Sequence, residues 1–576
     1  MMASKHRRKD EQKERVAIVG SGMAGLVTAY LLANDKRESQ SQSQSQQDGD
    51  GNADGDGNGN GNGGRFEVVL LEMQQRLSLD SASYTLPRRN QRQRRHSQSQ
   101  RRKDDSGYDS SGESTGGSAD EKLSQQQEEQ QGDEFEAEEE RRVDLPMRAF
   151  AAGYYDNLRK MYSYLGVRFE EPRFVYSLST TDSSRAAGEK ESGKGKEEGD
   201  VYFIHSSNNH ILPPIRPPGM SVIRWVVEVA YLLFWYTVFT MACFWVAPRT
   251  ATATLEPTAS NATEKTPLLR AAPADETLRQ YFTRLRVPTY YTSRYFLPLM
   301  SAVTTCTHAE LLDFPAVDVV TYARRTFRRP HYTIKGGVRQ AESKLAKGVD
   351  VWFGTRVTDV SSMEGGKVKV SWTGDNEGEE EFDKVIIAVT PDVVGKIFAP
   401  LKEEMNGIPT TSVSSIVHRD YSRISTTSAH LHAQSRFRRR AKTESYDGVG
   451  GISAAIHMVT DTRTARTESI HEHPSGMLIT TYPLAEGGIE EGNVLHRSRF
   501  VRVLRSVASR GVVNGIFGSQ RQLEDSGSEK DSWKNGDGGV YLVGGWCWDG
   551  MVMLEGCIVS AIRVADMLGV DVPWRS

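Results

Sequence analysis

The chain has 576 residues, more than the roughly 250–300 at which one hydrophobic core stops growing, so we expect at least two domains. Its formal net charge of −3 excludes a strongly basic protein, and no nucleic-acid partner is expected. The four cysteines show neither CxxC nor Cys/His spacing, so we expect free thiols in a reducing compartment and no metal. The first residues are charged, so no cleavable signal peptide is visible and an intracellular protein is expected.

Long polar stretches interrupt the chain and are too poor in apolar residues to fold by burial. We predict disorder for residues 1–14, 36–64, 88–142, 183–199, 249–273, 421–447 and 519–538. The remaining residues are still numerous enough for a two-domain enzyme.

A glycine-rich motif lies between a strand-like run at 15–19 and a helical apolar pattern at 26–33. Its residues are Gly20, Ser21, Gly22, Met23, Ala24 and Gly25. Strand, GxGxxG and helix in this order form a dinucleotide-binding unit. Gly20 allows the tight turn, Gly22 lets the backbone approach a pyrophosphate, and Gly25 lets helix and strand pack closely. The helix N-terminus then offers N–H groups to the phosphates.

The acidic partner of this motif is Glu72, at the end of a second apolar strand at 66–72. Glu72 lies 52 residues after Gly20, but removal of the 29-residue run 36–64 leaves 23. That is close to the spacing of about 20 at which an acid binds a ribose hydroxyl. The run therefore lies in a surface loop, and FAD or NAD is favoured over NADP. The alternative is a glycine-rich turn with an accidental acid.

The far end of the chain repeats the pattern of strand, glycines and helix. An apolar run at 539–545 ends in Gly544 and Gly545, and an amphipathic helix at 557–568 follows a loop. This arrangement resembles the FAD-dependent amine oxidase and phytoene desaturase superfamily. The resemblance implies that the closing segment returns to the first domain, with Gly544, Gly545, Met553 and Leu554 beside FAD.

Further landmarks resemble a family of predicted NAD/FAD-binding oxidoreductases within that superfamily. They lie at 142–144, 154–158, 164–167, 294–300, 312–315, 333–337, 383–391 and 417–420. The resemblance implies that Val357 binds adenine through its main chain, although an ordinary strand residue is the alternative. It also implies a cofactor contact at Arg76. The chain departs from the family at Ser78, where relatives carry glycine, and at Met553, where many relatives carry histidine.

A flavin accepts the hydride itself, so the protein supplies mainly orientation and a shielded pocket. Trp546 and Trp548 are the candidate catalytic residues, since strand alternation would point both rings to one side as a wall of the substrate site. The alternative is that both are core aromatics between domains. Cys547 is expected to be a buried free thiol rather than a covalent flavin link. His418 and Asp420 could serve acid–base chemistry or structural hydrogen bonds.

One apolar segment, 222–248, contains 20 uncharged residues at 229–248. As a helix this run is about 30 Å long, enough to cross a bilayer core. A single crossing would separate the two halves of the cofactor domain. We therefore expect either a monotopic or re-entrant membrane anchor or a helix buried in the substrate domain. The expected location is a membrane, with a soluble cytoplasmic protein as the alternative.

These observations predict an α/β fold with a discontinuous Rossmann-type FAD/NAD(P)-binding domain and an α+β substrate domain. The cofactor domain is assigned to 15–87, 331–400 and 539–576, the junction to 143–182, and the substrate domain to 201–330 and 401–518. The expected activity is hydride transfer from a C–N or C–C bond of a small lipophilic substrate to FAD. Alternatives are an isoprenoid or fatty-acyl desaturase or isomerase, and a membrane-tethered flavin-binding protein without turnover.

Overall fold

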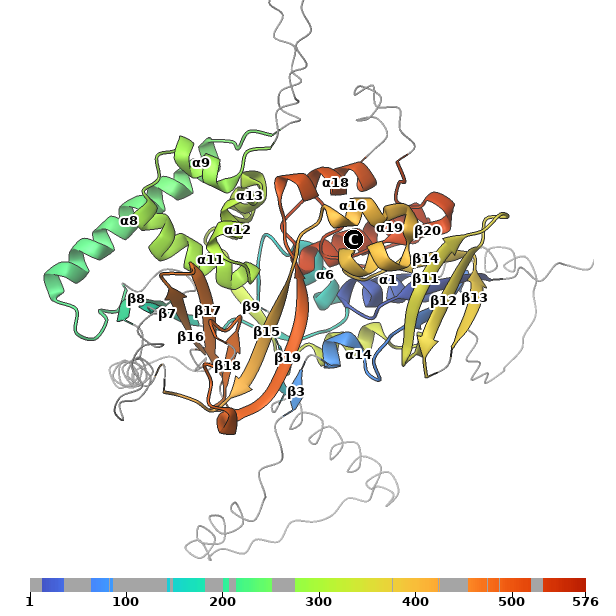
Figure 1. Ribbon diagram of the computed structural model, residues 1–576, viewed down its shortest axis with the longest axis horizontal. Coiled ribbons are helices and arrows are strands. Elements are labelled where there is room, and N and C mark those ends of the chain that lie inside the picture. The colour runs from blue at the N-terminus through green and yellow to red at the C-terminus, as the bar shows by residue number, and fades with distance from the viewer. Residues whose placement is uncertain are drawn as a thin grey trace, which may run out of the picture.

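A computed structural model gives the fold of the chain (Figure 1). It describes residues 13–35, 64–81, 83–85, 142–145, 149–172, 174–181, 200–206, 214–250, 275–375, 377–422, 424, 454–473, 475–485, 487–518 and 532–575. Most residues of the predicted disordered runs lie outside these ranges. The prediction was wrong at several edges. Glu14 begins a strand and Arg142 begins another. Ile424 is buried, and Trp533 packs on Phe398 with ring centroids 5.4 Å apart.

A five-stranded parallel sheet forms one half of the molecule. In spatial order its strands are β10 (Asp350–Trp352), β2 (Phe66–Leu71), β1 (Glu14–Val19), β14 (Lys384–Ile387) and β20 (Val540–Leu542). All neighbouring pairs are parallel. The strands are nearly continuous apolar runs because both faces of the sheet are covered. The fold is therefore of the mixed α/β type.

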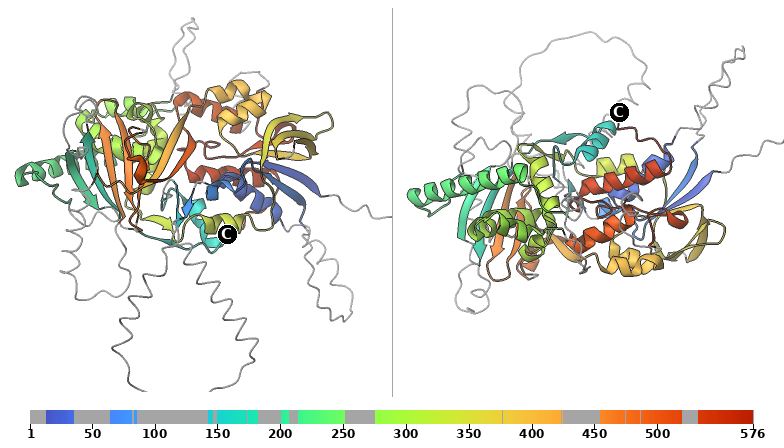
Figure 2. Two further views of the ribbon diagram at one scale, coloured as in Figure 1. Left: turned by 60° about the horizontal axis from the view of Figure 1, so that its bottom comes forward. Right: turned by 90° about the horizontal axis from the view of Figure 1, so that it is seen from above.

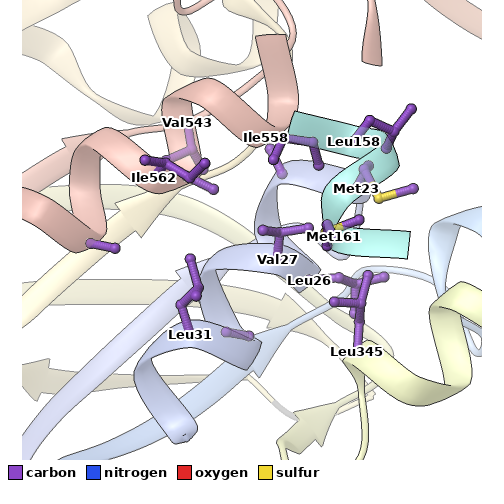
Figure 3. Packing of buried hydrophobic residues seen from close by; sticks show 14 of the residues in the cluster. Met23, Leu26, Val27, Leu31, Leu158, Met161, Leu345, Val543, Ile558 and Ile562 are labelled. Carbon is purple, nitrogen blue, oxygen red and sulfur yellow. The ribbon is translucent and has the colours of Figure 1, made fainter. Parts of the chain in front are cut away.

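Alternate residues of β1 enter two different cores. Val16 and Ile18 face a core shared with α1 (Met23–Ala33), α6 (Asp156–Tyr164), α14 (Arg339–Leu345) and α19 (Leu554–Met567). Figure 3 shows side chains of these four helices in that core. Ala17 and Val19 face the opposite core, formed with α15 (Pro391–Ile397), α16 (Lys402–Asn406) and α18 (Val507–Phe517). Helices α16 and α18 thus pack on the parallel sheet, although they fall within 401–518, which we assigned to the substrate domain.

A three-stranded antiparallel sheet adjoins the second of these cores. It consists of β11 (Thr355–Ser362), β12 (Val368–Gly374) and β13 (Gly378–Phe382). Its residues Val357 and Val360 share that core with the parallel sheet.

The other half of the molecule contains a seven-stranded sheet. Its order is β19 (Val494–Val503), β15 (Thr410–His418), β18 (Leu478–Thr481), β17 (Arg466–Glu472), β16 (Ala454–Asp461), β7 (Phe174–Thr181) and β8 (Asp200–Ser206). Only the β16–β7 pair is parallel among these described strands. Beside the sheet lie α8 (Val222–Trp245), α9 (Leu278–Arg284), α10 (Thr289–Tyr291), a π-helix at Thr292–Phe296, α11 (Leu297–Thr304), α12 (His308–Leu312) and α13 (Ala316–Thr326).

Short elements connect the two halves. They are α3 (Ser78–Ser81), the pair β3 (Tyr84–Thr85) and β4 (Arg142–Val143), and the three-stranded group β5 (Phe150–Ala151), β9 (His331–Ile334) and β6 (Phe169–Glu170).

Helix α8 projects at the end of the molecule farthest from the parallel sheet (Figures 1 and 2). Only Phe239, Ala242 and Cys243 are buried along its 24 residues. Among the described residues it is the one helix long and apolar enough to cross a membrane. The alternative of a helix buried in the substrate domain was therefore wrong. A single crossing remains excluded, because β1 and β2 precede α8 and β14 and β20 follow it within one sheet.

Candidate active site

The glycine turn lies between the end of β1 and the start of α1. Gly20 has a φ of +101°, a conformation that favours glycine, and its N–H donates to the carbonyl of Leu71 at 2.9 Å. A Cβ atom on Gly25 would lie 2.1 Å from the carbonyl oxygen of Gly20, so the helix touches the turn. Met23 and Ala24 begin α1 and are buried.

Gly22 occupies the N-cap position of α1 and borders open space. Among the residues that the structure describes, no atom beyond its chain neighbours lies within 4 Å of the position of its missing Cβ, and no side chain caps the helix. The first N–H groups of α1 are therefore available to an anion, as a dinucleotide phosphate requires.

Glu72 lies directly after β2 and contacts this turn. Its side chain is 3% exposed, and its Oε2 accepts hydrogen bonds from Ser21 N at 3.2 Å and Ser21 Oγ at 2.5 Å. Its Oε1 accepts one from Gln74 N at 2.9 Å. A carboxylate has about four acceptor sites, so Oε1 can also accept a ribose hydroxyl. These residues fit a dinucleotide such as FAD.

Ser78, where the family resemblance led us to expect glycine, joins the same hydrogen-bond network. Its Oγ donates to Glu72 Oε2 at 3.0 Å, and its N–H donates to Ser21 Oγ at 2.8 Å. The departure from the family pattern thus adds contacts with the turn. Arg76, by contrast, is exposed and makes no hydrogen bond or ion pair with a described residue. Its cofactor contact stays a prediction.

Val357 lies near Glu72, because the main chain of Glu72 joins two strands there. The N–H of Glu72 donates to Trp352 O, and the N–H of Thr355 donates to Glu72 O, both at 2.9 Å. Val357 follows in β11, pairs with Trp372 and is 8% exposed. Its adenine contact stays a prediction.

The closing glycines link β20 to the start of α19. The N–H of Gly544 donates to Ser560 Oγ at 2.9 Å, and a Cβ atom on Gly545 would lie 3.1 Å from Met553 O. Met553 is the N-cap residue of α19 and Leu554 its first helical residue; no side chain in the described part of the chain caps this helix. Helices α1 and α19 pack against each other, so two uncapped helix N-termini belong to one core (Figure 3).

The two tryptophans do not point to one side, so that prediction was wrong. Strand β20 ends at Leu542, and the alternation does not reach them. Trp546 is 3% exposed, packs on the α15 and α18 side, and donates its Nε1–H to Val389 O at 3.1 Å. Trp548 packs on the α1 and α19 side, 6.0 Å from the ring of Tyr154. Trp546 fits the alternative of a core aromatic, and a substrate contact at Trp548 stays a prediction.

The other three candidates, Cys547, His418 and Asp420, lie in environments that indicate structural roles. Cys547 is a buried free thiol whose pKa is raised by burial. His418 is buried, with Nε2 2.8 Å from Thr480 Oγ1, and its Nδ1 accepts the N–H of Asp420 at 3.1 Å. Asp420 in turn accepts the N–H groups of Ser422 and Glu490. These contacts fit the structural alternative for His418 and Asp420.

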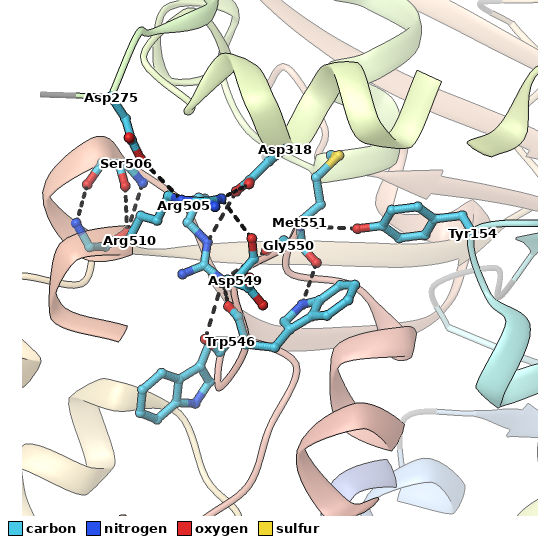
Figure 4. Close-up of polar contacts among 12 residues, drawn as sticks. Tyr154, Asp275, Asp318, Arg505, Ser506, Arg510, Trp546, Asp549, Gly550 and Met551 are labelled. Carbon is cyan, nitrogen blue, oxygen red and sulfur yellow. Dashed lines mark hydrogen bonds and ion pairs between the residues drawn. The ribbon is translucent and has the colours of Figure 1, made fainter. Parts of the chain in front are cut away.

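The loop between β20 and α19, residues 543–553, is named the closing loop here, and a buried charge network supports it (Figure 4). The sequence did not predict this network. Arg505, 2% exposed, donates from Nη2 to the carbonyls of Trp546 at 3.3 Å, Trp548 at 2.6 Å and Gly550 at 2.9 Å. Asp318 of α13 lies 3.7 Å from Arg505 Nε and forms an ion pair with Arg510. Arg505 and Asp318 thus fix the position of the closing loop from the side of α13.

Burial sets the ionisation of this network. Burial raises the pKa of Asp318 to about 6, with Arg510 and Arg505 opposing the rise, so the carboxylate is ionised at neutral pH. Burial also lowers the pKa of Arg505 from its usual value. No motif in the sequence pairs residues 318 and 505, because the contact forms only in the tertiary structure.

Glu555 ties α19 to α6. Its Oε1 accepts from Asn157 N at 3.0 Å and Asn157 Nδ2 at 2.7 Å, and its Oε2 accepts from Leu158 N at 3.0 Å. Burial raises its pKa in spite of these hydrogen bonds. An acid from the first turn of one helix therefore caps another helix, which fixes the direction of the α19 N-terminus.

Two polar residues on one face of the seven-stranded sheet were also missed. Arg502 of β19 contacts Met553, and His471 of β17 is a buried imidazole whose two nitrogens have no partner among the described residues. Burial lowers the pKa of His471 to about 3, so it is neutral. Neither stands out in the sequence, where arginines and histidines are frequent near both positions.

Comparison with known proteins identifies the chain as a FAD-dependent oxidoreductase, with FAD as its cofactor. Residues 252–476 match the family of flavin-containing amine oxidoreductases, which confirms the superfamily expected from the sequence motifs. The finer placement among the predicted NAD/FAD-binding oxidoreductases stays a prediction.

The chain is also similar to solved structures at low identity. Putrescine oxidase bound to putrescine has a TM-score of 0.48 and 10% identity, over 97% of this chain and 99% of that chain. A CLA-producing fatty acid isomerase from P. acnes has the same TM-score, identity and coverage. A comparison with curated protein sequences gave no match.

Proposed function

We propose that the protein oxidises a small lipophilic substrate by transfer of a hydride from a C–N or C–C bond to FAD. The observation that carries the proposal is that α1, which follows the glycine turn bound to Glu72, packs in one core against α19, whose N-terminus no described side chain caps. When bound, FAD supplies the hydride acceptor. The protein residues would bind it and exclude water: Gly22 and α1 hold the phosphates, Glu72 a ribose hydroxyl, and Met553 and Leu554 the ring system.

In this proposal the cofactor domain is discontinuous. The parallel sheet and its helices bind FAD, and the seven-stranded sheet with α8–α13 receives the substrate. Arg505 and Asp318 act as positioning residues, because they hold the carbonyls of the closing loop without standing at the proposed flavin contacts. Tyr154 adds a further support, as its hydroxyl accepts the N–H of Met551 at 3.1 Å.

The test uses the purified full-length chain with its native flavin. Anaerobic addition of a lipid extract should bleach the flavin absorbance, and readmission of air should restore it. Peroxide formed as air reoxidises the flavin indicates an oxidase, whereas bleached flavin that an added electron acceptor reoxidises faster than air indicates the desaturase alternative. An isomerase returns the hydride to its product, so it would form an altered lipid without net bleaching. Oxidised flavin that persists across lipid and amine extracts with no altered lipid, and that dithionite still reduces, would favour the flavin-binding protein without turnover.

The lipophilic substrate is supported by the outward face of α8. The exposed residues of this face are Val222, Ile223, Val226, Val227, Leu233, Phe234, Met241, Phe244 and Trp245. The one acidic residue of the helix, Glu228, turns inward and accepts hydrogen bonds from Tyr290 and Tyr295. The outward face between Val226 and Trp245 thus carries no charge. We propose that α8 lies in the plane of a membrane as a monotopic anchor, and the substrate enters from the lipid.

Replacing both Leu233 and Phe234 with Glu should remove membrane binding. Their side chains are 64% and 59% exposed, so the fold should not change. Each buried apolar side chain contributes roughly 1.5–3 kcal/mol, so vesicle affinity should fall at least tenfold. Flotation with phosphatidylcholine vesicles measures it.

The matched control is Met567→Glu, on a helix at the other half of the molecule and 52% exposed. It should float with vesicles like the unaltered protein. A dimer that dissociates in the double variant, with no flotation of either protein, would instead identify the face as a contact between two copies.

A further inference from the structure

Arg502 lies where the seven-stranded sheet, α11 and the start of α19 meet. Its Nε donates to Thr304 O at 3.2 Å, and its Nη2 lies 3.4 Å from Val303 O and 3.6 Å from Met553 Sδ. Val303 and Thr304 end α11, and Met553 is the N-cap residue of α19. The guanidinium therefore reaches from the proposed substrate side to the proposed flavin side.

The positive charge of Arg502 is not balanced by an acid. No carboxylate forms an ion pair with it in the described parts of the chain, whereas the neighbouring Arg505 and Arg510 both pair with Asp318. Burial lowers its pKa, and the groups that act on it are the phenol of Tyr155 and two thiols. Arginine nevertheless stays protonated at neutral pH. Its side chain is half-buried, and a partly desolvated cation without a counter-ion attracts an anion.

Its hydrogen-bonding capacity is also incomplete. A guanidinium has five N–H donors, and the contacts with α11 and Met553 use only Nε and Nη2. The carbonyls that end a helix carry about half an elementary charge, which does not neutralise a full cation. The Nη1 group bonds to no residue that the structure describes. A planar carboxylate is the group that such a donor set binds best.

The surroundings suit an apolar chain attached to that acid. Met300 of α11 is partly buried and packs against the cores of both halves of the molecule. Trp548 and Tyr322 are likewise partly buried and pack against the core of α1 and α19. Met300 lies one helical turn before Thr304, whose carbonyl accepts the hydrogen bond from Arg502, so an apolar side chain stands near the guanidinium.

We propose that Arg502 binds the acid group of the substrate, which is therefore a long-chain carboxylate. The inference rests on the proposed function, because it names the substrate class for the same site. The carboxylate would be fixed next to Met553, so that the hydrocarbon chain extends along the flavin side of the sheet.

The test compares two ligands of equal chain length, dodecanoate and dodecanol, by titration calorimetry on the flavin-loaded full chain. The unaltered protein should bind dodecanoate at least about tenfold more tightly, as expected for a charge-assisted hydrogen bond. Arg502→Met should lose this preference while still binding dodecanol, and Arg502→Lys should keep part of it. Arg499→Met, an exposed arginine on the same strand, should behave like the unaltered protein.

Several results would overturn the inference. Equal preference for dodecanoate in Arg502→Met and the unaltered protein would exclude a role in acid binding. A shifted flavin midpoint potential with unchanged ligand preference would assign the charge to the flavin instead. If both ligands bind more weakly and the melting temperature falls, Arg502 only caps the C-terminus of α11 and does not bind the acid group. Calorimetry needs no turnover, so a preference for the acid in a protein whose flavin is never bleached would separate this inference from the proposed function.

Discussion

Gly22→Ala should yield a folded protein that purifies without flavin. No atom of a described residue outside the turn itself lies within 4 Å of the added Cβ, and the backbone at Gly22 (φ −65°, ψ 172°) suits any residue. The stability of the cofactor-free protein should therefore change by less than about 1 kcal/mol. The methyl group would occupy the space through which the backbone approaches the pyrophosphate. The ratio of flavin absorbance to protein absorbance and the melting temperature measure the two effects.

Gly25→Ala should instead destabilise the fold, because the added Cβ would overlap with neighbouring atoms of the protein. The atom would lie 2.1 Å from the carbonyl oxygen of Gly20 and 3.1 Å from the Cβ of Ala388. Such overpacking costs typically 1–3 kcal/mol, so both folding and flavin binding should suffer. Gly511→Ala in α18 is the control, since its Cβ also enters open space and alanine favours a helix. Full flavin occupancy in purified Gly22→Ala would contradict the dinucleotide assignment of the turn.

Asp318→Asn should lower the free energy of unfolding by about 3–5 kcal/mol, as for the loss of one partner of a buried ion pair. Asp318 and Arg505 are each 2% exposed, so the remaining guanidinium stays buried without its counter-ion. Because Arg505 holds three carbonyls of the closing loop, we also expect weaker flavin binding. Urea unfolding at pH 7.5, where Asp318 is ionised, and flavin release on dilution measure the two effects.

The control for this variant is Asp566→Asn. Asp566 also accepts two hydrogen bonds from an arginine, Arg575, but the two side chains are 45% and 50% exposed. An exposed ion pair contributes at most about 1 kcal/mol. Equal destabilisation by the two substitutions would mean that the Asp318 network does not support the closing loop.

The cofactor side of the molecule was predictable because its signals are local. Gly20 and Glu72 stand at the ends of adjacent parallel strands, and removing the polar run between them restored a spacing that strand geometry dictates. The runs of β1 and β2 likewise indicated strands buried on both faces. The Ser21–Glu72 hydrogen bonds follow directly from that register.

The substrate side was less predictable because its contacts are tertiary. The directions of Trp546 and Trp548 depend on where β20 ends, which alternation alone could not indicate. The exposure of α8 depends on which helices cover it, and its composition is equally that of a core helix. Arg502 and Asp318 have no sequence signature, since their partners lie tens to hundreds of residues away.

The position of β20 and α19 in chain order has a consequence for biosynthesis. The ribosome delivers the chain from its N-terminus, and these elements follow α8 by about 300 residues. The glycine turn and Glu72 therefore emerge early, but the second uncapped helix comes only after every strand of the seven-stranded sheet. Flavin loading is then a late event in the life of the nascent polypeptide. The proposed membrane helix becomes available well before it, so attachment to lipid can precede maturation of the cofactor site.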